Sequence, residues 1–282
     1  MAVQTPDTEA PPAGIQYPPA RGTIEVRDVA RRFRTRGTQA TVFEDLSLEI
    51  ELGTFVSLVG ASGCGKSTLL LAIAGLHPPD TGEILYLREP THGPHREIVY
   101  IFQDYTKSIF PWLTVRGNVE FGLKHRRQMG RAERRDTARH FIELVGLAGY
   151  EAHYPAQLSG GMQQRVALAR ALACEPRVLL MDEPFSAVDA LTRTRLQELV
   201  LNLWHRMSLT ILFVTHDVDE AVFLSSRVVV MAGRPATFVR DIAIDLPYPR
   251  DAIATPEDPR FLASRHAILS DIFSVEMIGT ER

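Results

Sequence analysis

The pattern of apolar and polar residues in the first third of the chain predicts several strands and one helix. Residues 23–29 and 43–50 alternate between apolar and polar types, which is the pattern of a half-buried strand. Residues 55–59 form a third strand, residues 66–75 are apolar at helical spacing, and residues 97–102 form another strand. After the first strand, a run of arginines predicts either a solvated turn or a basic segment near a phosphate: Arg31, Arg32, Arg34 and Arg36.

The middle of the chain is predicted to be mostly helical. Helices are expected at 115–124, with Thr114 as a candidate cap, at 131–145 and at 162–174. Beyond them, strands alternate with helices again, with strands at 178–181, 210–215 and 227–231 and helices at 190–206 and 219–224. Continuous Val, Ile and Leu runs separated by helices indicate a parallel sheet that is covered on both faces. The fold class is therefore α/β, with a helical block inserted at about 104–175.

Composition adds to this picture mainly at the two ends of the chain. Residues 1–22 contain much Pro, Ala and Thr and too few aliphatic residues to offset the entropy of ordering, so we expect a disordered leader. Residues 23–241 form the expected folded domain, and residues 242–282 form a C-terminal tail. The net charge of −3 provides no basic field for nucleic acid. Apolar runs fall far short of the ~20 residues of a membrane helix, and the two cysteines, Cys64 and Cys174, lack metal-ligand spacing.

A glycine-rich loop between the third strand and the first helix is the strongest chemical signal. Its sequence, Gly-Ala-Ser-Gly-Cys-Gly-Lys-Ser-Thr over residues 60–68, is a P-loop in the strand–loop–helix setting that this motif requires. The glycines let backbone N–H groups curl around phosphates, Lys66 reaches the β- and γ-phosphates, and Ser67 offers a hydroxyl to Mg²⁺. We expect the loop to bind ATP through Gly60, Ser62, Gly63, Cys64, Gly65, Lys66, Ser67 and Thr68. The loop amides and Lys66 should also favour the thiolate of Cys64.

Two adjacent carboxylates end the apolar strand at 178–181. Asp182 suits Mg²⁺, which prefers hard oxygen ligands. Glu183 lies at the carboxyl edge of the strand, where ligands of open α/β sheets bind, and can orient and deprotonate an attacking water. The pair alone would be consistent with a solvated turn before Pro184; a P-loop in the same chain favours the catalytic interpretation.

A second candidate anion site precedes the helix at 162–174. Residues 158–165 read Leu-Ser-Gly-Gly-Met-Gln-Gln-Arg, so Ser159 can cap a helix whose first N–H groups are bared by Gly160 and Gly161. Such a cap on its own is more often structural. One chain cannot easily fold both anion sites onto one nucleotide, and a head-to-tail pair of chains is therefore predicted.

Taken together and in this order, the P-loop, the Leu-Ser-Gly-Gly-Met-Gln string and the Asp-Glu pair resemble the nucleotide-binding subunits of ATP-binding cassette (ABC) transporters. The resemblance covers about residues 23–241 and implies an ABC ATPase domain that hydrolyses ATP with Mg²⁺. The implied fold is that of a P-loop NTPase (RecA-like): a mostly parallel sheet with an antiparallel β subdomain and an inserted α-helical subdomain at about 104–175.

The same resemblance assigns roles to residues outside the P-loop. It implies that Glu183 is the catalytic base, that Gln103 senses Mg²⁺ and the attacking water, and that His216 contacts the γ-phosphate. Phe33 would stack on adenine, unless it is a core residue of the first sheet. The implied metal ligands are Ser67, Gln103 and Asp182. The implied nucleotide contacts of the second anion site and of the loop after Ser186 are Ser159, Gly160, Gly161, Gln163 and Asp189.

The segment that follows Gln103 resembles the bacterial importer ATPases for nitrate, sulfonate and taurine. In that branch Phe110, Trp112 and Leu113 would line the groove for a permease helix; the alternative is that they pack inside the helical block. The implied partners are integral-membrane permease subunits, a second ATPase chain, most simply an identical one, and, indirectly, a periplasmic solute-binding protein. The implied location is peripheral, at the cytoplasmic face of the inner membrane.

Other function classes fit the sequence less well. A soluble ABC ATPase that acts on DNA or ribosomes usually carries tandem cassettes, a coiled-coil insertion or zinc-binding cysteines, which this chain lacks. A small P-loop kinase would need no Leu-Ser-Gly-Gly-Met-Gln motif. An exporter ATPase is often fused to membrane helices.

Overall fold

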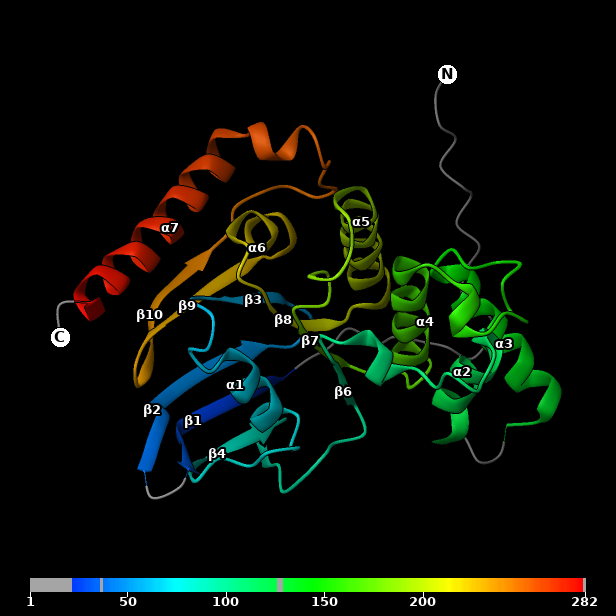
Figure 1. Cartoon of the computed structure of the whole chain (residues 1–282), viewed down its shortest axis with the longest axis horizontal. Coiled ribbons are helices and arrows are strands. Elements are labelled where there is room, and N and C mark those ends of the chain that lie inside the picture. The colour runs from blue at the N-terminus through cyan, green and yellow to red at the C-terminus, as the bar shows by residue number, and fades with distance from the viewer. Residues whose placement is uncertain (1–21, 36–37, 126–128, 281–282) are drawn as a thin grey trace.

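The strands of the computed structural model form one mixed sheet that spans the molecule (Figure 1). The structure describes residues 22–35, 38–125 and 129–280, so the expected leader at 1–22 lies almost wholly outside the described residues, as does Arg36. Within the described part of the chain, the sheet has ten strands in the order β5-β4-β1-β2-β10-β9-β3-β8-β7-β6. One half of the sheet is antiparallel and the other half is parallel.

The antiparallel half forms an arm at one side of the molecule. It consists of β1 (Thr23–Thr35), β2 (Thr38–Glu51), β4 (Thr81–Tyr86) and β5 (Glu89–Pro90). The alternation seen in the sequence correctly predicted β1 and β2, and β4 and β5 were not predicted. Of the two alternatives for the arginine run, the solvated turn does not hold for Arg31, Arg32 and Arg34, because β1 continues through them and pairs with β2 as far as Thr35. Arg31 and Arg32 bind the carboxylates of Asp80 and Glu44.

The parallel half is the part predicted from the buried runs. Its strands are β9 (Arg227–Gly233), β3 (Phe55–Val59), β8 (Thr210–Val214), β7 (Val178–Asp182) and β6 (Ile98–Ile101). Neighbours within this group are parallel throughout. An additional strand, β10 (Ala236–Ala243), was not predicted; it is antiparallel to β9 and joins the two halves through a pairing of Ala236 with Phe43 of β2. The predicted domain boundary at 241 therefore falls inside β10.

Helices cover both faces of the parallel strands, as expected. On one face α1 (Lys66–Ile73) packs between these strands and the antiparallel arm. On the other face lie α5 (Ala190–Met207) and α6 (Val218–Leu224), which share a core with the opposite side chains of the same strands. Within β3, for example, Val56 and Leu58 belong to the first core and Phe55 and Val59 to the second. This alternation explains why these strands are apolar at most positions.

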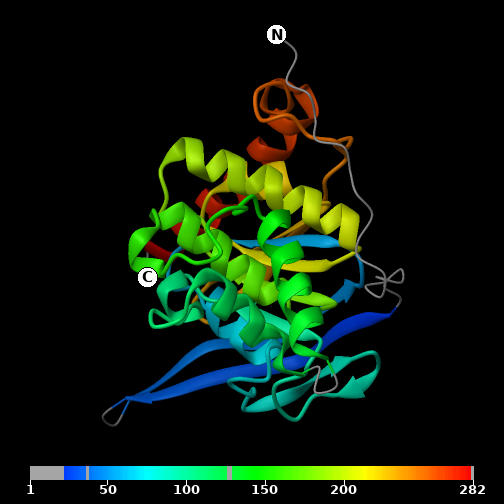
Figure 2. The same cartoon turned by 90° about the vertical axis from the view of Figure 1, so that its right-hand side faces the viewer.

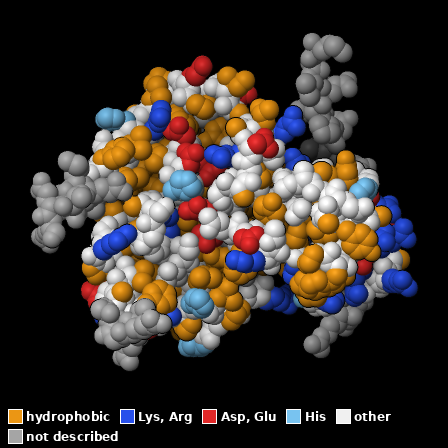
Figure 3. Space-filling model, in the orientation of Figure 1, with side chains coloured by type: hydrophobic (Ala, Val, Ile, Leu, Met, Phe, Trp, Pro, Cys, Tyr) orange, Lys and Arg blue, Asp and Glu red, His pale blue; other side chains and the backbone are white. Residues whose placement is uncertain are grey.

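In Figure 1 the inserted helical block lies to the right of β6 and β7, away from β1 and β2, and in Figure 2 it faces the viewer. It comprises η1 (Tyr105–Ser108), α2 (Val115–Gly122), α3 (Arg131–Leu144) and α4 (Gly160–Leu172), close to the predicted bounds. The predicted cap is confirmed, because the hydroxyl oxygen of Thr114 accepts a hydrogen bond of 3.1 Å from the amide of Gly117. Hydrophobic side chains gather beside Lys and Arg side chains on this block in Figure 3.

The C-terminal segment is a packed part of the fold. The sequence predicted only a tail, whereas the structure has a long helix, α7 (Pro259–Thr280), that contacts β9, β10 and α6. Two arginines tie this segment to α6. Arg250 is buried and donates hydrogen bonds to the carbonyl oxygens of Val222, Phe223 and Ser225 at the C-terminal end of α6, and Arg265 contacts Asp219 near its start at 2.8 Å. None of the described helices is long and apolar enough to cross a membrane.

Replacement of Arg250 tests how strongly the C-terminal segment holds α6. The Arg250→Met substitution should lower the free energy of unfolding by roughly 2–4 kcal/mol, because buried carbonyl oxygens lose their donors. Arg260 offers a matched control: it is also in the C-terminal segment, but its side chain is exposed and pairs with Asp258, so Arg260→Met should hardly change stability. Urea unfolding of both variants gives the comparison. Equal stability of the two would mean that the Arg250 contacts do not hold the segment.

Candidate nucleotide-binding and hydrolysis site

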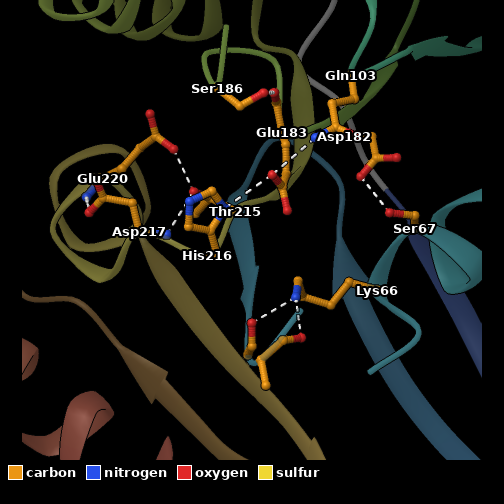
Figure 4. Close-up of polar contacts among 12 residues, drawn as sticks. Lys66, Ser67, Gln103, Asp182, Glu183, Ser186, Thr215, His216, Asp217 and Glu220 are labelled. Carbon is orange, nitrogen blue, oxygen red and sulfur yellow. Dashed lines mark hydrogen bonds and ion pairs between the residues drawn. The ribbon is translucent and has the colours of Figure 1, made fainter. Parts of the chain in front are cut away.

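Four neighbouring parallel strands deliver the predicted site residues to one edge of the sheet. The P-loop follows β3, His216 follows β8, Glu183 follows β7 and Gln103 follows β6. Because parallel strands present their carboxyl ends at the same edge, residues from distant parts of the sequence converge there. Figure 4 shows this convergence for Lys66 and the groups after β6, β7 and β8.

The P-loop has a backbone shape that requires glycine. Gly60, Gly63 and Gly65 have φ values of 152°, 77° and 102°, which side chains other than hydrogen rarely allow. A Cβ atom at Gly60 would lie 1.9 Å from the carbonyl oxygen of Met231 in the neighbouring strand. Gly65 is also the N-cap of α1 and supplies no capping side chain. The first amides of α1 are therefore left to an anion, as in other helix N-termini that bind phosphate.

Lys66 lies under the loop with its side chain almost fully buried. Its ammonium group donates hydrogen bonds of 2.7 and 2.8 Å to the carbonyl oxygens of Gly60 and Ala61. A phosphate in the loop would offer the same ammonium group oxygen acceptors of full negative charge. Cys64 is buried as well, with its sulfur 3.5 Å from the carbonyl oxygen of Met231 and 3.8 Å from Lys66 Nζ.

Asp182 connects the P-loop helix to the strand on its other side. Its Oδ1 accepts a hydrogen bond of 2.8 Å from Ser67, and its Oδ2 accepts one of 2.8 Å from the phenol of Tyr100 on β6. Burial and the neighbouring Asp182 charge raise the pKa of Tyr100 far above its ordinary value, so the phenol stays a donor at working pH. The oxygens of Ser67 and Asp182 are the hard donors that suit Mg²⁺. Tyr100 was not predicted, because a tyrosine in a strand pattern looks like an ordinary sheet residue.

Glu183 brings together the three residues for which a catalytic role was predicted. Its Oε2 accepts a hydrogen bond of 3.3 Å from Gln103 Nε2 and lies 3.0 Å from His216 Nδ1. The His216 side chain is 58% exposed and that of Glu183 is 18% exposed, so the cluster is open to solvent on the histidine side. A carboxylate whose oxygen is contacted by an amide and an imidazole can orient a water molecule and accept its proton.

A buried network behind His216 was not foreseen from the sequence. Glu220 accepts hydrogen bonds from Thr215 at 2.6 Å and from Gln197 of α5 at 2.9 Å. Asp217 caps α6, and its own amide donates to the Thr215 hydroxyl. Burial raises the pKa of Glu220 above its ordinary value. The residues on both sides of His216 are thus held by hydrogen bonds. The available signal was that Glu220, like Asp219, is an acidic residue in a short helix whose other residues are apolar.

The residues of the second predicted anion site lie elsewhere on the chain. Ser159 caps α4 by accepting from the amide of Met162 at 3.3 Å, and Gln163 donates to the carbonyl oxygens of Pro155 and Leu158. Asp189 caps α5, and hydrogen bonds from Thr192 lower its pKa. Among the described residues, no hydrogen bond or ion pair links Ser159, Gly160, Gly161, Gln163 or Asp189 to the Glu183 cluster or to Lys66. The idea that these residues form a second anion site stays a prediction.

The aromatic residue predicted to contact adenine is partly exposed. Phe33 lies on β1 with 42% of its surface exposed, and the guanidinium of Arg31 lies 5.2 Å from its ring centre. It is therefore no core residue, which was the alternative interpretation.

The apolar segment after η1 divides between core and surface. Ile109 is buried, Phe110 and Leu113 are half-buried, and Trp112 is 69% exposed and stacks on Phe110. The interpretation of this segment as purely internal packing therefore does not hold for Trp112. Arg170 of α4 lies over the Phe110 ring at 4.1 Å and donates a hydrogen bond of 2.7 Å to the Ser108 carbonyl oxygen.

Comparison with known proteins agrees with this geometry. The ABC transporter family matches residues 43–186. The chain is 48% identical over 224 residues to the nitrate import ATP-binding protein NrtD of Synechocystis, covering 79% of this chain and 83% of that protein. It is 43% identical over 228 residues to the aliphatic sulfonates import ATP-binding protein SsuB of Bacillus cereus, covering 81% and 88%. The dimeric ATP-binding cassette MJ0796, solved in a post-hydrolysis state with ADP and Pi, superimposes with a TM-score of 0.71 at 30% identity, over 79% of this chain and 100% of that one.

The closeness of Gly60 to Met231 gives a direct test of the loop geometry. A Gly60→Ala substitution should weaken ATP binding at least 10-fold and destabilise the protein by roughly 1–3 kcal/mol, because the loop must move away from the Met231 carbonyl. Gly93 is the control, since a Cβ atom there meets nothing within 4 Å. ATP binding by calorimetry, together with thermal unfolding, should separate the two variants. Wild-type affinity in Gly60→Ala would show that the loop tolerates a different shape.

Proposed function

The chain belongs to the ABC transporter family of ATP-binding proteins, and on this basis we propose that it is the ATP-hydrolysing subunit of a bacterial importer for a small anionic solute. The observation that carries the proposal is the cluster of Gln103, Glu183 and His216 at the sheet edge beside the P-loop. Relatives named for nitrate import and for aliphatic sulfonate import support the importer branch. A nitrate-like, sulfonate-like or taurine-like solute fits that branch. The alternative of an ATPase that acts on DNA or ribosomes has no support among these relatives.

ATP binding rests on the loop and on the arm. The amides of the P-loop and the ammonium group of Lys66 hold the phosphates, which requires Lys66 to exchange its two carbonyl partners for phosphate oxygens. Phe33, on the exposed surface of the arm, stacks on the adenine ring. The remaining P-loop residues predicted from the sequence, Ser62, Gly63, Cys64, Gly65 and Thr68, shape the loop around the phosphates.

Ser67 in α1 and Asp182 at the end of β7 lie close enough to bind one magnesium ion together. Ser67 Oγ and Asp182 Oδ1 lie 2.8 Å apart, and both are hard oxygen donors. The side-chain oxygen of Gln103, which follows β6, would supply a third ligand. When bound, Mg²⁺ neutralises charge on the phosphate oxygens.

Hydrolysis depends on the carboxylate of Glu183 as the general base. Gln103 and His216 contact its Oε2 and hold the carboxylate at the strand end. A water molecule placed between this carboxylate and the γ-phosphate loses its proton to Glu183 as it attacks. His216 is exposed enough to turn from the carboxylate to the γ-phosphate when nucleotide binds.

A second copy of the chain completes each nucleotide site. Ser159 caps the start of α4, and Gly160 and Gly161 place no side chain over the first N–H groups of the helix, which suits an anion. Among the described residues, no hydrogen bond or ion pair links this helix start to the P-loop. In a head-to-tail pair, α4 of one chain and the P-loop of the other enclose one ATP, with Gln163 and Asp189 beside them. The dimeric cassette MJ0796 supports this arrangement.

The exposed part of the segment at 109–113 docks an integral-membrane permease. Trp112 presents a large apolar surface to solvent, which is typical of an interface. Phe110 and Leu113, half-buried beneath it, shape the groove. The permease holds the chain at the cytoplasmic face of the inner membrane, and a periplasmic solute-binding protein delivers the solute on the other side.

Removal of the proposed base separates binding from hydrolysis. Glu183→Gln should reduce ATP turnover by about 10²–10⁴-fold and leave ATP affinity within a few-fold of wild type. Glu257→Gln, an exposed glutamate near α7, is the control and should hydrolyse ATP normally. Phosphate release and nucleotide binding on the purified variants provide the two readouts. Turnover near the wild-type rate in Glu183→Gln would exclude this residue as the base.

A second substitution tests the docking segment. Trp112→Ala should keep the ATPase activity of the isolated chain, because the side chain is largely exposed and makes no contact with the hydrolysis cluster. It should abolish co-purification with the permease and solute uptake. Phe273→Ala on α7, which is 60% exposed, is the matched control and should retain both. Normal assembly and uptake by Trp112→Ala would place the docking surface elsewhere.

A further inference from the structure

Tyr100 contacts Asp182 in the candidate site, and none of the predicted roles explains this contact. It lies on β6, and its phenol donates a hydrogen bond of 2.8 Å to Oδ2 of Asp182 on β7. The strand register explains how the two meet. Tyr100 pairs with Leu180, so Asp182 lies two residues further along the neighbouring strand, on the same face of the sheet.

The two oxygens of the Asp182 carboxylate have different partners. Ser67 binds Oδ1 from the side of α1, and Tyr100 binds Oδ2 from the side of β6. A carboxylate with one free oxygen can rotate about its terminal torsion, which has a broad energy profile. With both oxygens held, the plane of the group is fixed. The oxygen beside Ser67 then stays directed toward the place where a cation would meet both groups.

We propose that Tyr100 is a positioning residue for Mg²⁺: it holds the Asp182 carboxylate so that Oδ1 and the Ser67 hydroxyl are presented to the ion together. The proposal rests on the function proposed above, in which Asp182 and Ser67 are metal ligands. Partners that orient a metal-binding carboxylate commonly account for 10–100-fold in metal affinity or activity. Tyr100 acts through Asp182 and touches neither ATP nor the reacting water.

The position of β6 also lets Tyr100 connect Asp182 to the segment that carries Gln103. Among the described strands, β6 is the last of the sheet and pairs only with β7. The Tyr100 ring also packs against Phe102 at 4.6 Å between ring centres, immediately before Gln103. One residue therefore connects the strand that carries Asp182 to the segment that carries Gln103. The metal ligand and the residue beside the proposed base keep a fixed spacing across the sheet edge.

The chain contains a matched control for this interaction. Tyr86 also donates a hydrogen bond, of 2.7 Å, to a carboxylate, that of Glu97, and burial raises its pKa as it does for Tyr100. Tyr86 lies on β4 in the antiparallel arm, among residues that take no part in the hydrolysis cluster. Loss of its hydroxyl costs a comparable hydrogen bond at a place where Mg²⁺ does not bind.

The experiment compares Tyr100→Phe, Tyr86→Phe and Asp182→Asn with wild type. Binding of a fluorescent ATP analogue is titrated with Mg²⁺, and binding of Mn²⁺ to the protein–ATP complex is followed by electron paramagnetic resonance. The affinity for the analogue in excess chelator reports on nucleotide binding without metal. Tyr100→Phe should raise the Mg²⁺ concentration at half-saturation about 10-fold and leave the metal-free affinity unchanged, and Tyr86→Phe should change neither.

The outcomes separate this inference from the function on which it rests. If Asp182→Asn raises the Mg²⁺ requirement and Tyr100→Phe does not, the metal site stands and the role of Tyr100 is refuted. If Asp182→Asn leaves the Mg²⁺ requirement unchanged, the metal site itself is wrong. An equal effect of Tyr86→Phe and Tyr100→Phe would mean that general loss of stability, and no positioning of Asp182, causes the change.

Discussion

The backbone turn at Glu183 is the constraint on which the site depends. Residues in a strand point alternately to opposite faces, so two adjacent carboxylates cannot both serve one edge if the strand simply continues. After Asp182 the strand ends, and Glu183 takes a left-handed conformation with φ of 42°. Its amide donates a hydrogen bond of 2.9 Å to the carbonyl oxygen of Val214 on β8, which holds this uncommon conformation in place. Asp182 can then face Ser67 and Tyr100 while Glu183 faces Gln103 and His216.

The chain segment that begins at Gln103 connects the hydrolysis cluster to the surface of the helical block. Gln103 is followed by η1 and then by the segment that ends in the exposed Trp112. Arg170 of α4 binds that segment through the Ser108 carbonyl oxygen and the Phe110 ring. The same helix is capped by Ser159, the proposed contact with the partner's nucleotide. The contact between Glu183 and Gln103 is therefore joined through Arg170 to the surface proposed for the permease and to the helix proposed to meet the partner's nucleotide.

Sequence reasoning located the elements and residues that follow a periodicity or a motif, and it missed those that depend on tertiary contacts. The buried strands, α1, α2 and α4 were predicted within a few residues, and the predicted residues Gln103, Glu183 and His216 do come together. The strand β10 and the helix α7 were missed, because β10 is mostly exposed and α7 has no strong apolar face of its own. Tyr100 was missed for a different reason. Its contact depends on the register between two strands, which a single sequence does not specify.

The central claim is that one chain carries two half-sites and that ATP joins two chains across them. The most direct measurement is the molar mass of the Glu183→Gln variant by light scattering, with and without ATP, since slow hydrolysis should preserve the closed pair. The account predicts a dimer with ATP and mostly monomer without it, and it predicts monomer under both conditions when Lys66→Ala is added to the same variant. A mass that ignores nucleotide, or a dimer that forms equally well with Lys66→Ala, would contradict the account.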